Sequence, residues 1–155
     1  MEILMKARWK ILIAVGVFLA VFIGIQFVPS PHTNPPVTRE VSWDSPATRA
    51  LAQRACMDCH SNLTEWPWYS YIAPVRFLVV NDVNGGRKRM NFSEWNKAQR
   101  ATAEDIEDRV GNNEMPPKNY VMAHPLAKLT PAEIKQLVDG MRVTYQKDPP
   151  GASIK

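Results

Sequence analysis

An uninterrupted apolar segment near the N-terminus limits what this chain can fold into. Residues 11–28, ILIAVGVFLAVFIGIQFV, carry no charge over 18 positions. As a helix that rises about 1.5 Å per residue, the segment would be about 27 Å long, close to the ~30 Å hydrocarbon core of a bilayer. A secretory signal has a shorter apolar region of about 7–15 residues and a small-residue cleavage site. The sequence after residue 28 matches such a site poorly, so we expect an uncleaved membrane anchor.

Basic residues flank the anchor on one side only. Lys6, Arg8 and Lys10 precede it, and no Lys or Arg follows it until Arg39. The positive-inside rule then places the N-terminal flank in the cytoplasm and the rest of the chain on the outer side. This flank supplies much of the net charge of +4, so the remainder is close to neutral. No basic stripe interleaved with aromatic residues is present, and nucleic acid is not an expected partner.

Composition divides the chain into five parts. The flank is residues 1–10 and the anchor is residues 11–28. A proline-rich linker covers residues 29–44, with four prolines among its first eight positions. Such a composition favours an extended, semi-rigid spacer. We expect the folded domain at residues 45–146 and a short tail at residues 147–155.

The pattern of the folded part predicts an all-α domain. Ser45, Ser93 and Thr130 are typical N-cap residues at the starts of helical patterns, and Thr130 begins a capping box. Gly85 and Gly86 are expected to end a short apolar element, which by composition could be a helix or a strand. A helical domain of this size, with long irregular connections, buries little apolar area by itself. We therefore expect a bound group to fill its middle.

Both cysteines of the chain lie in the segment CMDCH, at Cys56 and Cys59, with His60 directly after them. A disulfide between cysteines three residues apart would close almost no loop and would gain little entropy. A thioredoxin-like dithiol belongs to a βαβ context that the sequence does not predict. A zinc site needs four ligands, and no second cysteine pair exists to complete one. The fourth interpretation is covalent haem c, for which C-x-x-C-H is the attachment pattern.

The spacing of the motif suits the chemistry of that attachment. Two thiols one helical turn apart can each form a thioether with one of the two vinyl groups on one side of the porphyrin. The following histidine then projects beneath the iron as its proximal ligand. An exported domain agrees with this, because haem c is attached on the outer side of the membrane. We expect one covalent haem c, held by Cys56, Cys59 and His60, in a periplasmic domain tethered to the bacterial inner membrane.

The sixth iron ligand has two candidates. Met115, in the segment EMPPKNY, is followed by two prolines that fix an extended loop and remove two backbone donors. Such a loop can hold a thioether at bonding distance, and Met115 is the favoured ligand. His124, in the segment AHPLA, is the rival. The alternative is that Met115 only fills a gap in the core and that His124 is a structural histidine in a turn. The remaining possibility is an open or water-bound distal site.

An aromatic cluster follows the cysteine motif. Trp66, Trp68 and Tyr69 are expected to border the porphyrin and exclude water from it, although ordinary core packing would produce the same pattern. Arg76 is a candidate partner for a haem propionate.

Three segments together resemble a known family. The runs CMDCHSNLTEWPWYSYIAPV, NFSEW and EMPPKNYVMAHPLAKLTPAE are similar to the bacterial haem-binding-domain family of small cytochrome c-like proteins. The resemblance covers residues 45–145. It implies a single c-type haem in an all-helical, cytochrome c-like domain, often with a membrane tether. It also implies Cys56, Cys59 and His60 as attachment and proximal residues and Met115 as distal ligand, while the His-Pro pair at His124 matches as well.

Electron transfer is the function that these features favour. A membrane-anchored monohaem cytochrome would carry single electrons between periplasmic or membrane redox partners, and the tether would raise its concentration near them. The alternative is a haem-based sensor or ligand-binding protein with a displaceable distal ligand. Peroxidase-type catalysis would need distal acid/base groups, and no distal His–Arg pair is identifiable. We therefore do not expect an enzyme.

Overall fold

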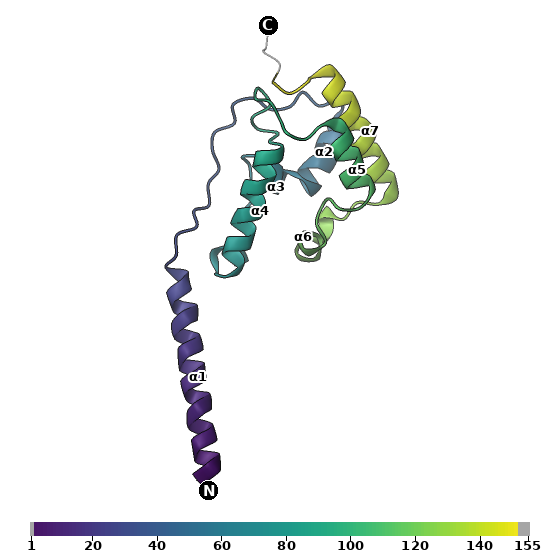
Figure 1. Cartoon of the computed structure of the whole chain (residues 1–155). Coiled ribbons are helices and arrows are strands. Elements are labelled where there is room, and N and C mark those ends of the chain that lie inside the picture. The colour runs from purple at the N-terminus through teal and green to yellow at the C-terminus, as the bar shows by residue number, and fades with distance from the viewer. Residues whose placement is uncertain (1, 152–155) are drawn as a thin grey trace. The chain divides into compact units, whose positions relative to one another are not determined.

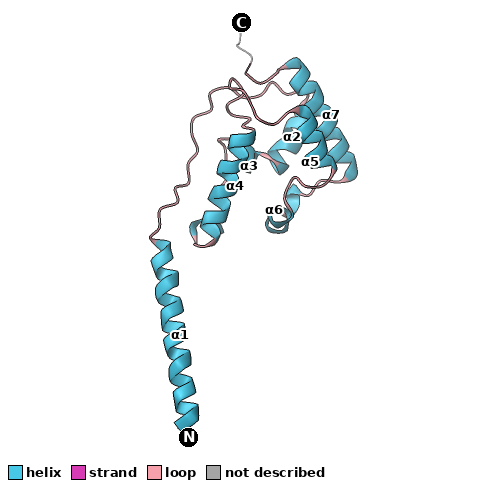
Figure 2. Cartoon of the chain, in the orientation of Figure 1, coloured by secondary structure: helices cyan, strands magenta, loops and turns pink. Residues whose placement is uncertain are grey.

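The structure is a computed structural model, and it describes residues 2–151 (Figure 1). Within this range all regular elements are helical, and no strand is formed (Figure 2). The α-helices are α1 (Glu2–Gln26), α2 (Pro46–Ala55), α3 (Met57–His60), α4 (Val75–Arg89), α5 (Ala103–Gly111), α6 (Lys118–Ala123) and α7 (Pro131–Lys147). Two short 3-10 helices are η1 (Trp68–Tyr71) and η2 (Pro125–Ala127). The expected all-α class is confirmed for the described residues.

The chain divides into two compact units. Unit 1 comprises residues 1–32 and 67–80, of which residue 1 lies outside the described range, and it contains α1, η1 and the first residues of α4. Unit 2 comprises residues 33–66 and 81–155, of which residues 152–155 are not described, and it contains α2, α3, the rest of α4 and α5 to α7.

Helix α1 in unit 1 is long and apolar enough to cross a bilayer. The stretch Lys6–Gln26 has 21 residues, and none of its most apolar window is buried. The helix ends at Gln26, two residues before the end expected from the apolar run. A lone helix with an apolar surface on every side would be unfavourable in water, because exposed apolar area is costly there.

Helices α2, α5 and α7 of unit 2 build its core. Helix α2 begins at the N-cap Ser45, whose side chain accepts a hydrogen bond from the backbone N–H of Thr48. Helix α7 begins with a capping box between Thr130 and Glu133, as expected. Their buried faces join one hydrophobic cluster, whose fully buried members include Ala52, Phe92, Trp95, Leu137 and Met141.

A very close helix crossing joins α2 to α7. A Cβ atom added to Gly140 would lie 2.0 Å from Oγ1 and 2.9 Å from Cβ of Thr48. Real Cβ atoms essentially never show such separations, so only glycine permits this approach. Thr48 is buried within the contact. Glycine is therefore required at position 140 despite its poor helix propensity.

The segment before α2 and the end of α7 are held together. Arg39 forms an ion pair with the buried carboxylate of Asp148, which also accepts a hydrogen bond from the backbone N–H of Ser42 at 2.8 Å. The indole N–H of Trp95 donates to the backbone carbonyl of Asp148 at 2.7 Å. Val41 is buried in the core cluster. Packing in unit 2 thus includes residues on both sides of the 45–146 range that the sequence assigns to the domain.

Two sequence expectations about local structure were wrong. Helix α4 does not end at Gly85 and Gly86 but continues through both to Arg89. Ser93 does not cap a helix, because residues 91–102 form turns and α5 begins after the N-cap Thr102. In each case a tertiary contact outweighs local propensity: Gly86 meets α3, and the Ser93 hydroxyl accepts a hydrogen bond from the backbone of Asn62.

We expect Gly140→Ala to lower the free energy of unfolding by about 1–3 kcal/mol, because the added methyl group overpacks the α2–α7 crossing. Gly111→Ala is the matched control, since nothing lies within 4 Å of a Cβ atom added at that helical glycine. Chemical denaturation of the full chain would measure both. Equal stability of the two variants would contradict the close crossing.

Candidate functional site

One cavity of about 490 Å³ lies within unit 2. Residues of α2 to α7 line it, together with the loop between α5 and α6. Its apolar wall includes Phe92, Leu137 and Met141, which are also members of the hydrophobic core. Pockets for small molecules and cofactors usually measure about 300–1,000 Å³, so this cavity has the size of a cofactor site.

Cys56 and Cys59 both line the cavity. Cys56 lies between α2 and α3, as the C-cap of one and the N-cap of the other, and Cys59 lies in the single turn of α3. Burial, and secondarily the charge of Cys59, raises the pKa of the Cys56 thiol to about 12. Burial, with the charges of Asp82 and Asp58, raises the pKa of Cys59 to about 11. Redox-active and zinc-binding cysteines have lowered thiol pKa values, whereas the pKa values of these two thiols are raised.

His60 lines the same cavity with a fixed ring orientation. Its Nδ1 atom lies 3.1 Å from the backbone carbonyl oxygen of Met90. A carbonyl can only accept, so Nδ1 must carry the proton and Nε2 is left as the basic nitrogen. Burial lowers the pKa of His60, against hydrogen bonds to Met90 and Gly86 that raise it. This neutral, oriented imidazole matches the usual form of a metal-ligating histidine.

The two central glycines of α4 shape the wall next to His60. A Cβ atom on Gly86 would lie 2.4 Å from the carbonyl oxygen of Cys59, so α3 approaches α4 there as closely as glycine allows. A Cβ atom on Gly85 would meet no protein atom within 4 Å, and Gly85 itself lines the cavity. The two glycines therefore have different roles. Gly86 admits a neighbouring backbone, and Gly85 leaves open space at the cavity wall.

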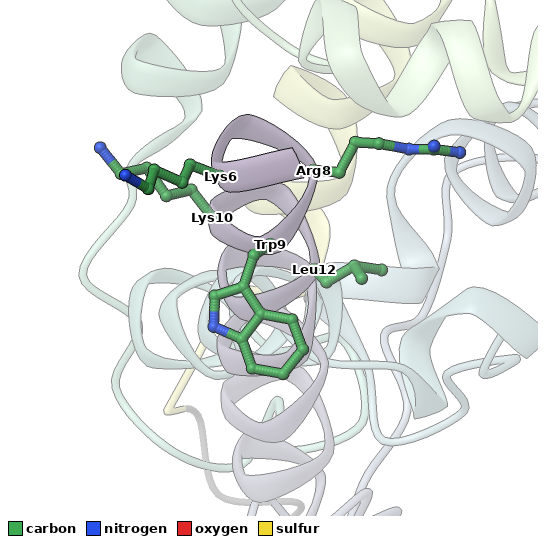
Figure 3. Close-up of a pocket in the computed structure, with 5 residues that line it drawn as sticks. All are labelled: Lys6, Arg8, Trp9, Lys10 and Leu12. Atoms are coloured by element: carbon green, nitrogen blue, oxygen red, sulfur yellow. The ribbon is translucent and has the colours of Figure 1, made fainter. Parts of the chain in front are cut away.

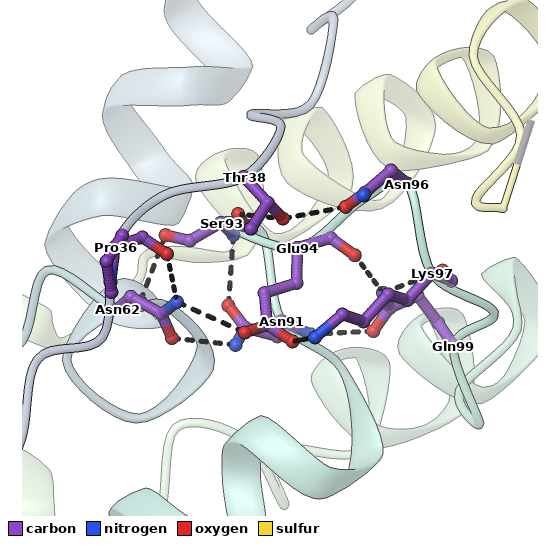
Figure 4. Close-up of polar contacts among 9 residues, drawn as sticks. All are labelled: Pro36, Thr38, Asn62, Asn91, Ser93, Glu94, Asn96, Lys97 and Gln99. Carbon is purple, nitrogen blue, oxygen red and sulfur yellow. Dashed lines mark hydrogen bonds and ion pairs between the residues drawn. The ribbon is translucent and has the colours of Figure 1, made fainter. Parts of the chain in front are cut away.

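Buried polar groups hold the chain directly after His60 (Figure 4). Asn91 donates from its side-chain amide to Oδ1 of Asn62 at 2.8 Å. The backbone N–H of Asn62 donates to Oγ of Ser93 at 2.9 Å, and the N–H of Ser93 donates to Oδ1 of Asn91 at 3.0 Å. All three residues are buried. Because each buried polar group finds a partner, the network fixes the segment after α3 against the segment after α4.

Arg87 reinforces this attachment. Its guanidinium donates to the carbonyl oxygen of Ser61 at 2.7 Å and to the hydroxyl of Thr64 at 2.8 Å. It also donates to the carbonyl of Thr33 and the side chain of Asn34, at 2.7 and 3.0 Å. Arg87 belongs to α4 and thus connects this helix to two other segments of unit 2, residues 33–34 and 61–64.

Met115 lines the cavity from the loop that follows α5. The backbone N–H groups of Glu114 and Met115 both donate to the carbonyl of Arg109, at 2.8 and 3.0 Å. The side chains of Arg109 and Glu114 form an ion pair at 2.6 Å. Pro116 and Pro117 follow and also line the cavity. The methionine thioether is therefore presented by a loop that is anchored to the end of α5.

Tyr120 connects this loop to the cysteine motif. Its hydroxyl donates to Oδ2 of Asp58 at 2.7 Å, and its ring stacks on the imidazole of His124 with centroids 4.5 Å apart. Burial, and then the hydrogen bond to Asp58, raises the pKa of Tyr120. Tyr120 lines the cavity, whereas His124 is not among the described residues that do. Of the two distal candidates, the structure brings Met115 and not His124 to the cavity of His60.

The predicted aromatic contacts have a different outcome. Among the described residues, the cavity lining does not include Trp66, Trp68 or Tyr69. Trp66 belongs to unit 2 and donates from its indole N–H to Asn34 at 3.2 Å. Trp68 and Tyr69 belong to unit 1, and Trp68 is 76% exposed. Contact between these three residues and a cofactor stays a prediction.

Comparison with known proteins identifies the family. A model of the haem-binding domain family matches residues 20–143, from within α1 to within α7. The chain belongs to this family. No match was found among curated proteins, and none was found among solved structures. Haem is therefore the cofactor that the cavity residues of this haem-binding domain should fit.

The lining residues fit a haem. The cavity presents two cysteine thiols, an imidazole with its Nδ1 proton engaged, and a thioether, which are groups that attach or ligate haem. Gly85, which has no side chain, and apolar residues of the core complete the lining. Among the described residues, no group of three or more His, Cys, Asp and Glu side chains is arranged to hold a metal ion.

Several functional residues of this haem-binding domain were not found from the sequence. Asp58 and Tyr120 are 62 positions apart, and no local pattern predicts their hydrogen bond. The acceptor at Met90 is a backbone carbonyl, so the residue type at this position does not reveal it. The Gly85–Gly86 pair could have been recognised, since two glycines within an otherwise helical pattern indicate a close approach as well as a helix end.

We expect Gly86→Ala to push α3 away from α4 and to disturb the positions of Cys59 and His60. The free energy of unfolding should fall by about 1–3 kcal/mol, as for other overpacked sites. The haem content of the purified protein, measured as the ratio of haem to protein absorbance, should fall with it. Gly111→Ala again serves as control. A Gly86→Ala protein with wild-type stability and haem content would contradict the tight contact between α3 and α4.

Proposed function

We propose that this chain is a membrane-anchored monohaem c-type cytochrome, and that it carries single electrons between redox partners on the outer face of a bacterial inner membrane. The observation that carries the proposal is the single cavity lined by Cys56, Cys59, His60 and Met115. A haem c held there would supply a one-electron iron couple inside a helical, cytochrome c-like domain. We propose a carrier and not an enzyme, with redox proteins as its partners.

Cys56 and Cys59 would attach the ring. Each thiol would add across one vinyl group, with sulfur bonding to one vinyl carbon and the thiol hydrogen passing to the other, so that no atom is lost. Their positions, at the N-cap of the one-turn helix α3 and within that turn, support this role. Because burial keeps both thiols protonated at neutral pH, they are protected from disulfide exchange, which requires the thiolate.

His60 would be the proximal iron ligand through Nε2. The hydrogen bond from Nδ1 to the Met90 carbonyl fixes the tautomer and the ring plane and raises the basicity of the ligating nitrogen. The backbone carbonyl of His60 in turn accepts a hydrogen bond from the N–H of Phe92 at 2.8 Å. The ligand is thus held from both its side chain and its backbone by the segment after α4.

Met115 would be the distal ligand and would favour electron transfer over sensing. Its loop is attached to α5 through Arg109 and to α3 through the Tyr120–Asp58 hydrogen bond. A displaceable ligand needs a loop that can move away, whereas this loop has ties on both sides of the methionine. Methionine and histidine together raise the reduction potential of haem iron relative to two histidines.

The N-terminal helix would hold the domain at the membrane. Lys6, Arg8 and Lys10 at its start favour a cytoplasmic N-terminus by the positive-inside rule. Residues 29–155 would then lie on the outer side, where haem c is attached. This topology is an independent reason to prefer covalent haem over a cytoplasmic thiol chemistry for the two cysteines.

The distal ligand can be tested with two substitutions. Oxidised wild-type protein should show the far-red absorption band of methionine-ligated haem iron. We expect Met115→Ala to abolish this band and to lower the reduction potential by a fraction of the roughly 0.8 V range that axial ligation spans. His124→Ala should retain the band, because its ring stacks on Tyr120. A band that survives in Met115→Ala, or that is lost in His124→Ala, would contradict the assignment.

Carbon monoxide separates electron transfer from sensing. With Met115 bound on the distal face, the reduced wild-type protein should show little spectral change under carbon monoxide, and Met115→Ala should bind it readily. The measurement is the difference spectrum of reduced protein with and without the gas, in the protein purified with its anchor. Ready binding by the wild type would instead favour the ligand-binding alternative.

A further inference from the structure

Exposed apolar side chains are concentrated in a part of unit 1 that has no role in the cavity. Residues 67–80, PWYSYIAPVRFLVV, contain a single charged residue, Arg76. Several large side chains of this stretch are exposed: Trp68 at 76%, Leu78 at 64% and Tyr71 at 56%. Ile72 and Val75 are also exposed. A patch of this kind usually marks a surface that meets a protein or a membrane.

Hydrogen bonds tie this stretch to the end of α1. The side-chain amide of Gln26 donates to the carbonyl of Ala73 at 3.1 Å and accepts from the N–H of Ala73 at 2.9 Å. The guanidinium of Arg76 donates to the carbonyls of Ile25, Gln26 and Val28, at 3.2, 3.1 and 2.8 Å. Ile25 and Gln26 are the last two residues of α1, and Val28 lies just beyond it, where helix carbonyls lack most of their intrahelical donors. Arg76 therefore caps α1, and its contact with a haem propionate stays a prediction.

A second contact secures the same arrangement. Nε2 of His32 lies 2.8 Å from the carbonyl oxygen of Ser70, and its ring stacks on Tyr71 with centroids 4.3 Å apart. Ser70 is completely buried. With the single cation engaged at the helix end, the exposed surface of residues 67–78 is left without a charge. Phe27, directly after the end of α1, is another exposed apolar side chain of unit 1, at 80%.

The N-terminal part of α1 carries side chains that are typical of the edge of a bilayer (Figure 3). Trp9 is 66% exposed there, and Lys6 and Lys10 extend to one side of the helix and Arg8 to the other. The hollow among these side chains is bounded by α1 alone. A tryptophan with flanking cations is typical of a membrane–water interface. From Trp9 to Gln26 the helix rises about 26 Å, near the ~30 Å hydrocarbon thickness, so the end of α1 would reach the other interface.

We propose that residues 67–78 form a second membrane contact, in which Trp68, Tyr71 and Leu78 enter the interfacial region of the bilayer beside the end of α1. The inference rests on the proposed membrane anchoring by α1. Lipid is the occupant that the observations favour, because the patch is hydrogen-bonded to the end of the spanning helix and Trp, Tyr and Leu are typical interfacial side chains. It gives Trp68 a role other than cofactor contact, and the chain would meet the membrane at two points far apart in sequence.

Site-specific photocrosslinking to lipid tests this inference. The full chain, with its haem, would be reconstituted into vesicles of phosphatidylethanolamine and phosphatidylglycerol. The photoreactive residue p-benzoylphenylalanine would replace Trp68 or Leu78, one at a time. In place of Phe18, within α1, it reports whether the anchor is in the bilayer. In place of Lys135, whose side chain is 80% exposed in unit 2, it controls for labelling by chance. Adducts are read from the intact mass of the protein after irradiation.

We expect lipid adducts at positions 18, 68 and 78 and none at position 135. Adducts at position 18 with none at 68 and 78 would overturn the second contact and leave the anchor in place. No adduct at position 18 would refute the anchor, and the inference with it. Equal labelling at position 135, or crosslinks from 68 and 78 to a second protein chain, would also overturn the inference, since the patch would then not be specific for lipid.

Discussion

The hydrogen bond between Nδ1 of His60 and the carbonyl of Met90 is the contact on which the site depends. It sets the histidine tautomer, and it can form only because α3 lies directly against α4. That approach requires Gly86, whose absent Cβ leaves room for the carbonyl of Cys59. The buried Asn62, Asn91 and Ser93 then hold the two segments in register. One backbone acceptor, one glycine and one polar network therefore place both cysteines and the histidine at the same wall.

The cavity is also the missing part of the core. Phe92, Leu137 and Met141 belong to the hydrophobic cluster and line the cavity at the same time. Protein interiors are normally close-packed, and small helical domains have little apolar area to spare. A cavity of about 490 Å³ in such a domain is therefore best explained as space for a cofactor. Membership of the haem-binding domain family and the residues of the cavity wall agree on which cofactor that is.

Structural features that depend on neighbouring residues were predicted from the sequence. Features that depend on contacts between distant residues were missed. The apolar α1, the N-cap Ser45 and the capping box at Thr130 have signals within a few residues, and each was predicted. The continuation of α4 through Gly85 and Gly86 was missed, because glycine favours helix ends unless a neighbouring backbone needs the space. The tie of Arg76 to the end of α1 joins residues about 50 positions apart, and no local pattern could indicate it.

The account as a whole depends on one haem held covalently by Cys56 and Cys59. The most direct test is the intact mass of the protein after denaturation, for the full chain purified from a host that makes c-type cytochromes and treated with a thiol-alkylating reagent. The account predicts a single species with the mass of the chain plus one haem and no alkylated cysteine. A bare polypeptide with both cysteines alkylated would contradict it, whatever haem was lost during denaturation.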